Sequence, residues 1–191
     1  MIEYIDQDHV YLYNGEIIPS VTQILSFIFP DKYKGVPEFI LKNKANYGSK
    51  IHEAIEKFEN EGIIEKLDYI QEASFKQYLR LKKEYKIEVI DQEKIIHYKD
   101  IYAGRYDMSA NVNGEYNLID IKTTSELDIE YLSWQLSLYD FPSKKRHEKL
   151  YALWLPKKNL GKLVEIPRKS DEEIKEKLKE LIKWKKEQEN G

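Results

Sequence analysis

The chain has 191 residues, of which 41% are hydrophobic and 34% are charged, and its formal net charge is −3. This length and apolar content suit one domain with a single sizeable core. A slightly acidic chain does not coat nucleic acid through bulk positive charge, so any such contact needs a local basic surface. Because there is no cysteine, disulfides, thiolate zinc sites, iron–sulfur clusters and cysteine nucleophiles are excluded.

No targeting or membrane signal is visible in the sequence. The first fifteen residues have neither a basic segment nor an apolar segment of the kind found in signal peptides. No apolar run approaches the length of a membrane span. We therefore expect a cytoplasmic protein with no membrane partner.

The first 85 residues predict one hairpin and three helices. A hairpin around the turn Asn14-Gly15 is followed by a helix that Ser20 or Thr22 can cap. Two longer helices, with apolar residues at helical spacing, follow a lysine-rich segment. The predicted ranges are 9–21 for the hairpin, 23–28 for the first helix, 31–45 for a loop with a short helix from Pro37, and 45–61 and 67–85 for the longer helices.

After residue 85 apolar residues recur at every second position instead of at helical spacing, and this pattern predicts strands. Three strands are expected to meander through residues 86–123, and a strand at 148–155, reached through a helix, should run parallel to one of them. This order predicts an α/β fold with a central mixed sheet and helices on both faces. The remaining predicted elements are a helix from Ser125 or Asp128 to about Asp140, an edge strand at 161–166, and a helix opened by a Ser170–Glu173 capping box.

The hairpin over residues 101–124 holds the most informative side chains. Its Asn113-Gly114 pair is typical of a two-residue type I′ turn, which fixes the register. Counting outward from that turn, Asp107 faces Asp120 and Arg105 faces Lys122. Because side chains alternate between the faces of a strand, these four polar residues are expected to share one face. The opposite, core-facing side is predicted to carry Tyr106, Met108, Ile119 and Ile121.

Two carboxylates directly opposite each other on a sheet repel unless a cation lies between them. Carboxylate oxygens are the ligands that Mg²⁺ and Mn²⁺ prefer, so Asp107 and Asp120 are candidate metal ligands. Lys122 lies within one side chain of that position, where a neighbouring cation would make its ammonium lose a proton more easily. The alternative reading is a solvated sheet face that tolerates a like-charge pair.

Four short motifs occur in order along the chain, each on the appropriate kind of element. They are Gly48-x-x-x-His52, Gly104-x-x-Asp107, Asp120-x-Lys122 and Gln135-x-x-x-Tyr139. Together they resemble the PD-(D/E)XK nuclease superfamily, and within it the RecB-type branch that includes phage exonucleases. The resemblance covers about residues 44–156 and implies a restriction-endonuclease-like core. The iron–sulfur cysteines of some subgroups are absent, so no such cluster is expected.

The resemblance also implies a role for each matched residue. Asp107, Asp120, His52 and the backbone carbonyl of Ile121 would bind one or two Mg²⁺ or Mn²⁺ ions, with Glu93 as a further candidate ligand. Lys122 would orient or deprotonate the attacking water and stabilise the transition state. The candidate substrate contacts are Gln135 and Tyr139, which line the site in the family, together with Arg105, Lys44 and Lys50, for which structural or solvated surface roles stay open.

The function that the resemblance implies is metal-dependent hydrolysis of DNA, most simply by an exonuclease acting on linear ends in phage or recombination and repair processing. DNA is then the partner, and a helicase or a single-strand annealing or binding protein would supply any unwinding. Three alternatives stay open: a structure-specific or nicking endonuclease, a catalytically silent DNA-binding module, and an unrelated carboxylate metal-binding protein. We expect one nuclease domain over 1–191, with N-terminal elements at 1–45, a catalytic core at 46–156 and a C-terminal strand and helix at 160–189.

Overall fold

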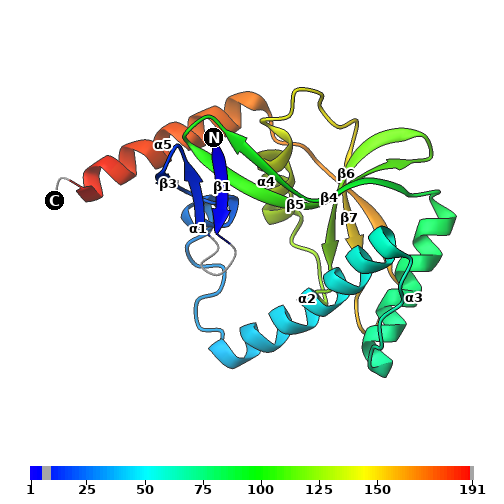
Figure 1. Ribbon diagram of the computed structural model, residues 1–191. Coiled ribbons are helices and arrows are strands. Elements are labelled where there is room, and N and C mark those ends of the chain that lie inside the picture. The colour runs from blue at the N-terminus through cyan, green and yellow to red at the C-terminus, as the bar shows by residue number, and fades with distance from the viewer. Residues whose placement is uncertain (6–9, 190–191) are drawn as a thin grey trace.

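The fold is built on a five-stranded mixed sheet in the order β4-β5-β6-β7-β8, with a separate three-stranded sheet at the N-terminus (Figure 1). This computed structural model describes residues 1–5 and 10–189. Within these residues no helix combines the length and apolarity needed to cross a bilayer. The elements are β1 (Ile2–Ile5), β2 (Val10–Tyr13), β3 (Glu16–Ile18), α1 (Val21–Ile28), α2 (Glu38–Glu61), α3 (Tyr69–Glu84), β4 (Glu88–Tyr98), β5 (Tyr102–Val112), β6 (Glu115–Lys122), α4 (Ile129–Asp140), β7 (Leu150–Trp154), β8 (Lys162–Ile166) and α5 (Asp171–Glu189).

The predicted sheet topology is confirmed. Strands β4, β5 and β6 form an antiparallel meander, and β7 pairs parallel to β6 after the α4 crossover. β8 pairs antiparallel to β7 at the edge of the sheet. The fold class is therefore α/β, as predicted.

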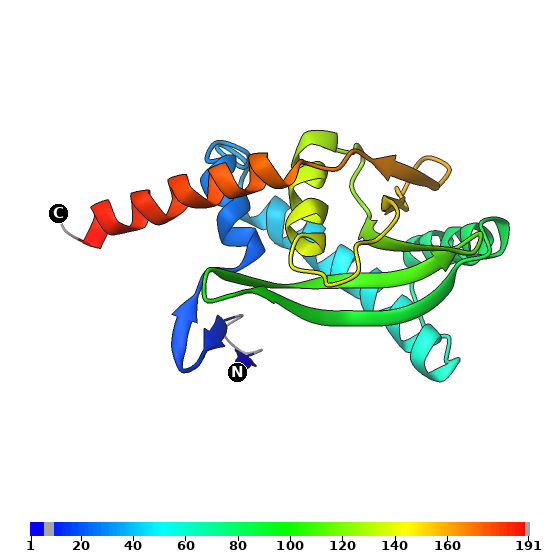
Figure 2. The same ribbon diagram turned by 90° about the horizontal axis from the view of Figure 1, so that it is seen from above.

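Two hydrophobic clusters cover the two faces of the large sheet. One contains residues of α1, α4 and α5, and the other contains residues of α2 and α3. Figure 2 shows α4 above the long β4–β5 ribbon, with α5 running past it and beyond the body of the molecule. The apolar faces that helical and strand periodicity require are thus buried between layers, as expected for this class.

Two elements differ from their predicted form. α2 begins at Glu38, directly after Pro37, so the predicted short helix and the helix at 45–61 are one continuous element. No glycine or proline interrupts residues 38–47, and nothing in that stretch therefore stops the helix. The N-terminal hairpin turn at Asn14-Gly15 is confirmed, but β1 adds a third strand that its four residues did not reveal. His9, at the predicted start of that hairpin, lies outside the described residues.

A buried polar network ties the end of α4 to the segment before β7. The fully buried carboxylate of Asp140 accepts hydrogen bonds from the backbone N–H and the ring Nδ1 of His147 and from Arg146. Arg168 reaches the same carboxylate. The other ring nitrogen of His147, Nε2, is buried and has no hydrogen-bond partner among the described residues. Protonating His147 would therefore bury an unsatisfied N–H group.

This network predicts acid sensitivity. Burial, reinforced by the charges of Lys94 and Arg146, lowers the pKa of His147 to about 4. The unfolded chain, with a histidine pKa of about 6.5, binds the proton more tightly. The burial of neutral His147 therefore contributes fully to the unfolding free energy above pH 6.5, and this contribution is lost as pH falls towards 4. Between pH 7 and pH 5 we expect wild type to lose about 2 kcal/mol of unfolding free energy relative to His147→Asn, measured by urea denaturation. A difference that does not change with pH would contradict this assignment.

Candidate metal-binding and catalytic site

The hairpin between β5 and β6 begins as predicted and then opens. Asn113 and Gly114 both have positive φ, and the pairing runs in the predicted register from Val112↔Glu115 to Met108↔Ile119. The ladder ends there. The carboxylate of Asp107 then accepts the backbone N–H of Ile121 at 2.6 Å. The predicted cross-strand pairs Asp107–Asp120 and Arg105–Lys122 are therefore wrong, because a side chain takes the place of the next backbone rung.

The same irregularity changes which way the side chains point. Tyr106 packs in the cluster with α4, whereas Met108, Ile119 and Ile121 pack in the cluster with α2 and α3, so the predicted common face for these four is wrong.

On the neighbouring strand Glu93 has φ +47°, a left-handed conformation that is rare for a glutamate inside a strand. Such conformations persist only where the surroundings impose them, and they are concentrated at functional sites.

Three side chains from three different elements converge at this irregularity. His52 comes from α2, Glu93 from β4 and Asp107 from β5, and one potential ligand atom of each lies within 4.8 Å of the other two. All three side chains are partly buried. Two carboxylates and one imidazole form a donor set that suits Mn²⁺ and Mg²⁺. Glu93, at first only a further candidate ligand, thus belongs to the central group.

The orientation of His52 is set by β6. Its Nε2 lies 3.0 Å from the carbonyl oxygen of Ile121, and its Nδ1 lies 3.4 Å from Asp107. A carbonyl only accepts hydrogen bonds, so Nε2 carries the hydrogen and Nδ1 of the neutral ring is the nitrogen that can bind a metal. In this arrangement the carbonyl of Ile121, which the resemblance implies to be a ligand, holds the imidazole that faces the carboxylates.

Asp120 and Lys122 form a second pair beside this group. The carboxylate of Asp120 is buried and contacts Lys122 Nζ at 2.5 Å. Burial raises the pKa of Asp120 to about 6, against the opposing charge of Lys122. Burial also acts to lower the pKa of Lys122, but Asp120 and Asp107 outweigh it and raise the value, so Lys122 is an ammonium near neutral pH.

The charges of the three central residues are coupled. Burial disfavours the imidazolium of His52, but the adjacent Asp107 carboxylate outweighs it and raises the pKa of His52 to about 9. Burial acts to raise the pKa of Asp107, yet His52 holds it below its usual value. Burial and the charge of Asp107 raise the pKa of Glu93. In the absence of a metal, the proton on His52 thus supplies positive charge among these carboxylates.

The predicted helix residues lie beside the site, and a glycine makes room for one of them. Tyr139 is buried on α4, and Gln135 Oε1 is a buried acceptor with no hydrogen-bond partner among the described residues. Burial raises the pKa of Tyr139 well above its usual value. A Cβ atom on Gly104 would lie 2.7 Å from both the Tyr139 ring and Val21, so the Gly104-x-x-Asp107 motif has a steric cause at its first position.

The two motif glycines are therefore expected to respond oppositely to alanine. Gly104→Ala should cost about 1–3 kcal/mol, because its methyl group overpacks the core against Tyr139 and Val21. Gly48→Ala should gain about 0.5–1 kcal/mol, because the nearest atom to its Cβ is Thr123 Oγ1 at 3.4 Å and alanine favours a helix interior. Urea denaturation of both variants measures this, and equal effects of one sign would contradict the steric explanation.

Two clefts are lined by residues that pair with carboxylates of the site, Lys122 with Asp120 and Arg105 with Glu93. One, about 570 Å³ in volume and here called the Lys122 cleft, lies between the segment that leads into α2 and the start of α4. The other, about 470 Å³ and here called the Arg105 cleft, lies between the N-terminal sheet, α1 and β5. Among their lining residues are Lys32, Tyr33, Lys44, Lys122 and Thr124 for the first, and Tyr4, Tyr11, Gln23, Arg105 and Tyr139 for the second.

The predicted basic contacts divide between these surfaces. Lys44 lines the Lys122 cleft. Arg105 lines the Arg105 cleft, where its Nε lies 2.8 Å from Glu93 and its guanidinium lies over the Tyr4 ring. Lys50 instead pairs with Glu53 at 2.6 Å on the exposed side of α2 and lines neither cleft.

Some cleft residues were not identified from the sequence. Lys32 Nζ bonds to Asp128 at 2.5 Å and lies over the Tyr131 ring, which fixes the segment before α2 against the start of α4. Its neighbour Tyr33 lines the Lys122 cleft. These contacts join residues nearly one hundred positions apart, so no local sequence pattern predicts them.

Comparisons with known proteins do not assign a family. No family model matches the chain, and no curated protein matches it. Among solved structures the chain is similar to the crystal structure of SSO0001, with a TM-score of 0.48 and 20% sequence identity over 91% of this chain and 77% of that one. A similarity of this degree assigns no activity.

Proposed function

We propose that this protein is a divalent-metal-dependent deoxyribonuclease that hydrolyses phosphodiester bonds, acting as an exonuclease on linear DNA ends. The observation that carries the proposal is the convergence of His52, Glu93 and Asp107 beside the Asp120–Lys122 pair. The four ordered motifs that resemble the PD-(D/E)XK nucleases, with their restriction-endonuclease-like core, contain all of these residues except Glu93. The preference for ends comes from that resemblance alone.

The donor atoms fit Mg²⁺ or Mn²⁺. Two carboxylates and a neutral imidazole nitrogen are all competent ligands, and the positive charge of the His52 proton can be exchanged for that of an ion. Asp120 lies close enough to influence the pKa of His52, so the implied involvement of Asp120 with one or two ions stays part of the proposal. A bound ion would supply charge neutralisation at the phosphate and a more acidic water.

The protein's own groups supply the remaining chemistry. The ammonium of Lys122 suits the negative charge that develops on the phosphate oxygens, and Asp120 holds it in place at 2.5 Å. If Lys122 is to take a proton from water, it must first lose its own, and a nearby cation favours that loss. The resemblance implies that Gln135 is a substrate contact, and its buried Oε1 has no hydrogen-bond partner among the described residues. Lys44 and Arg105 are placed in clefts on either side, where they can meet substrate phosphates.

The test uses linear DNA, single- and double-stranded and labelled at either end, and covalently closed circles. Each is incubated with Mg²⁺, Mn²⁺ or EDTA. The expected result is degradation of linear DNA alone, abolished by EDTA. Cut circles would replace the exonuclease proposal by a structure-specific or nicking endonuclease. Absence of cleavage in every substrate would favour a silent DNA-binding module or a metal-binding protein of another kind.

A further inference from the structure

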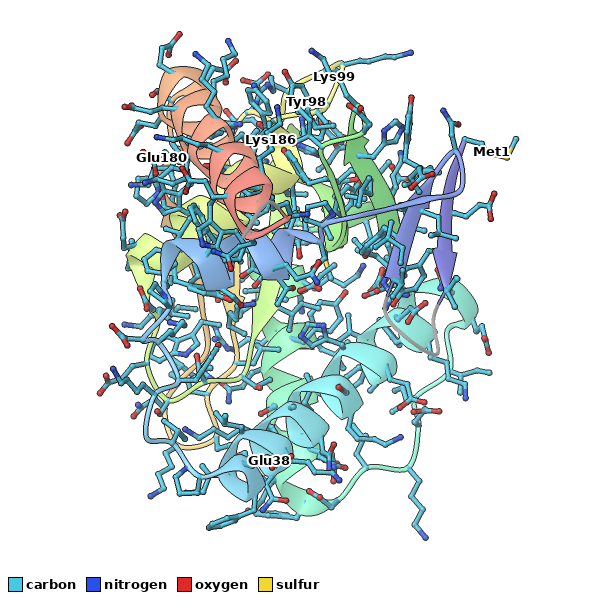
Figure 3. The ribbon with its side chains drawn as sticks, turned by 90° about the vertical axis from the view of Figure 1, so that its left-hand side faces the viewer. Met1, Glu38, Tyr98, Lys99, Glu180 and Lys186 are labelled. Atoms are coloured by element: carbon cyan, nitrogen blue, oxygen red, sulfur yellow. The ribbon has the colours of Figure 1, made fainter. Side chains whose placement is uncertain are left out.

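A third concave surface lies next to the Lys122 cleft. This basic pocket, about 270 Å³, is formed by α2, the segment after β6 and the turn after β7. Lys44 and Thr124 line both the pocket and the Lys122 cleft, so the two are adjacent. The residues used below are Lys44, Tyr47, Thr124, Ser125, Lys157 and Lys158. Figure 3 shows α2 with its first residue, Glu38, labelled.

The pocket carries positive charge without counter-charge. Lys44, Lys157 and Lys158 are three of its nine lining residues, and none of these nine is acidic. Within the described part of the chain no carboxylate lies within 4.0 Å of the Nζ atoms of these lysines. By contrast, Lys50 and Lys57 on the same helix α2 pair with glutamates at 2.6 Å. Unpaired cations that converge in a concave site create a field that attracts anions.

The side chains that line the pocket are held in place, and they favour a charged group over a stacked nucleobase. The hydroxyl of Tyr47 is tied to Ser74 at 2.8 Å, and Lys157 Nζ lies 3.7 Å from the centre of the Tyr47 ring. That face of the ring is therefore taken by a cation and is not free for base stacking. Thr124 is held by hydrogen bonds to Glu126 and from Trp154, both 2.7 Å long, so the backbone next to Ser125 is positioned in advance.

We propose that the basic pocket binds a phosphate group of the nucleic-acid strand, next to the phosphate held at Lys122. This inference rests on the proposed function, because it takes the occupant of the Lys122 cleft to be a polynucleotide. Lys44, Lys157 and Lys158 neutralise the phosphate, and the hydroxyl of Ser125 donates a hydrogen bond to it. A terminal phosphate monoester and an internal diester share this chemistry.

The test measures binding without catalysis. A short fluorescent single-stranded oligonucleotide, with a 5′-phosphate, a 3′-phosphate or neither, is titrated in EDTA over a series of salt concentrations. The pocket variant is Lys157→Gln with Lys158→Gln, two exposed residues whose loss leaves the core intact. The control is Lys175→Gln with Lys179→Gln, which removes the same charge from the exposed side of α5. Thermal melts confirm that both fold.

We expect the pocket variant to bind roughly tenfold more weakly at low salt and its salt slope to fall by about 0.7, the value for one single-strand phosphate, while the control stays within about twofold of wild type. If wild type binds one end-phosphorylated oligonucleotide more tightly and the pocket variant loses this preference, the pocket binds a terminal monoester. If the variant loses the same affinity for all three oligonucleotides, the pocket binds an internal phosphate. An unchanged pocket variant, an equal loss in the control, or a wild type without salt-dependent binding would overturn the proposal. Since no metal is present, these outcomes are independent of whether linear DNA is cleaved.

Discussion

Lys122→Met should abolish DNA hydrolysis while leaving the protein folded and able to bind Mn²⁺. Methionine keeps the length of the side chain but removes the ammonium that lies 2.5 Å from Asp120. Losing both an electrostatic partner of the transition state and a candidate proton acceptor is expected to reduce the rate by about 10³-fold or more. The measurement is a time course of nucleotide release from end-labelled linear DNA.

The fold should tolerate this change because Asp120 can adapt. Its pKa is already raised to about 6 by burial, and without Lys122 it can take up a proton rather than remain a buried unpaired charge. The matched control is Lys162→Met, an exposed lysine on the edge strand β8, whose activity should equal that of wild type. Activity of Lys122→Met within about tenfold of wild type would remove Lys122 from the chemistry.

The second large effect is stabilisation by metal. An ion that binds only the folded chain raises its unfolding free energy by about 2.7 kcal/mol at one hundred times its Kd, which for a chain of this size corresponds to roughly 5–11 °C in Tm. We expect millimolar Mn²⁺ to produce a shift of this order in wild type, because the ion relieves repulsion among Glu93, Asp107 and Asp120.

Asp107→Asn should eliminate that shift, since Asp107 touches His52 and belongs to the central group of three. The asparagine oxygen can still accept the N–H of Ile121, so the opened hairpin is expected to persist. Asp100→Asn, at an exposed residue in the turn between β4 and β5, is the control and should shift as wild type does. A wild-type melt that does not respond to Mn²⁺ would count against the site itself.

Local rules in the sequence were enough for most of the fold. The turn at Asn113-Gly114, the Ser170–Glu173 capping box and the parallel placement of the strand after α4 all follow from short-range chemistry, and all are present. The four-residue strand β1 was missed because a segment this short carries too little periodicity. The division into one domain over 1–191 stays a prediction.

The detailed geometry of the site was beyond local rules for a physical reason. Counting residues from the turn assumes an unbroken ladder, but a side chain of the hairpin itself ends the ladder, and other side chains of the site come from elsewhere in the chain. Asp107 meets the N–H of Ile121, and His52 arrives from a helix more than fifty residues earlier. Glu93 joins the central group from β4, and Asp120 pairs with Lys122 beside it.

The most direct test of the central claim, that His52, Glu93 and Asp107 form one metal centre, is a calorimetric titration of Mn²⁺ into Glu93→Gln. The predicted hairpin register suggests Asp107 and Asp120 as metal ligands without Glu93. The Glu93→Gln variant therefore distinguishes that prediction from the group observed in the structure. We expect at least a tenfold weaker Kd than wild type, roughly the loss that even supporting residues of metal sites cause. Asp91→Asn, two residues away on β4 and outside the group, should bind as wild type does. Equal Mn²⁺ affinity in wild type and Glu93→Gln would contradict the claim.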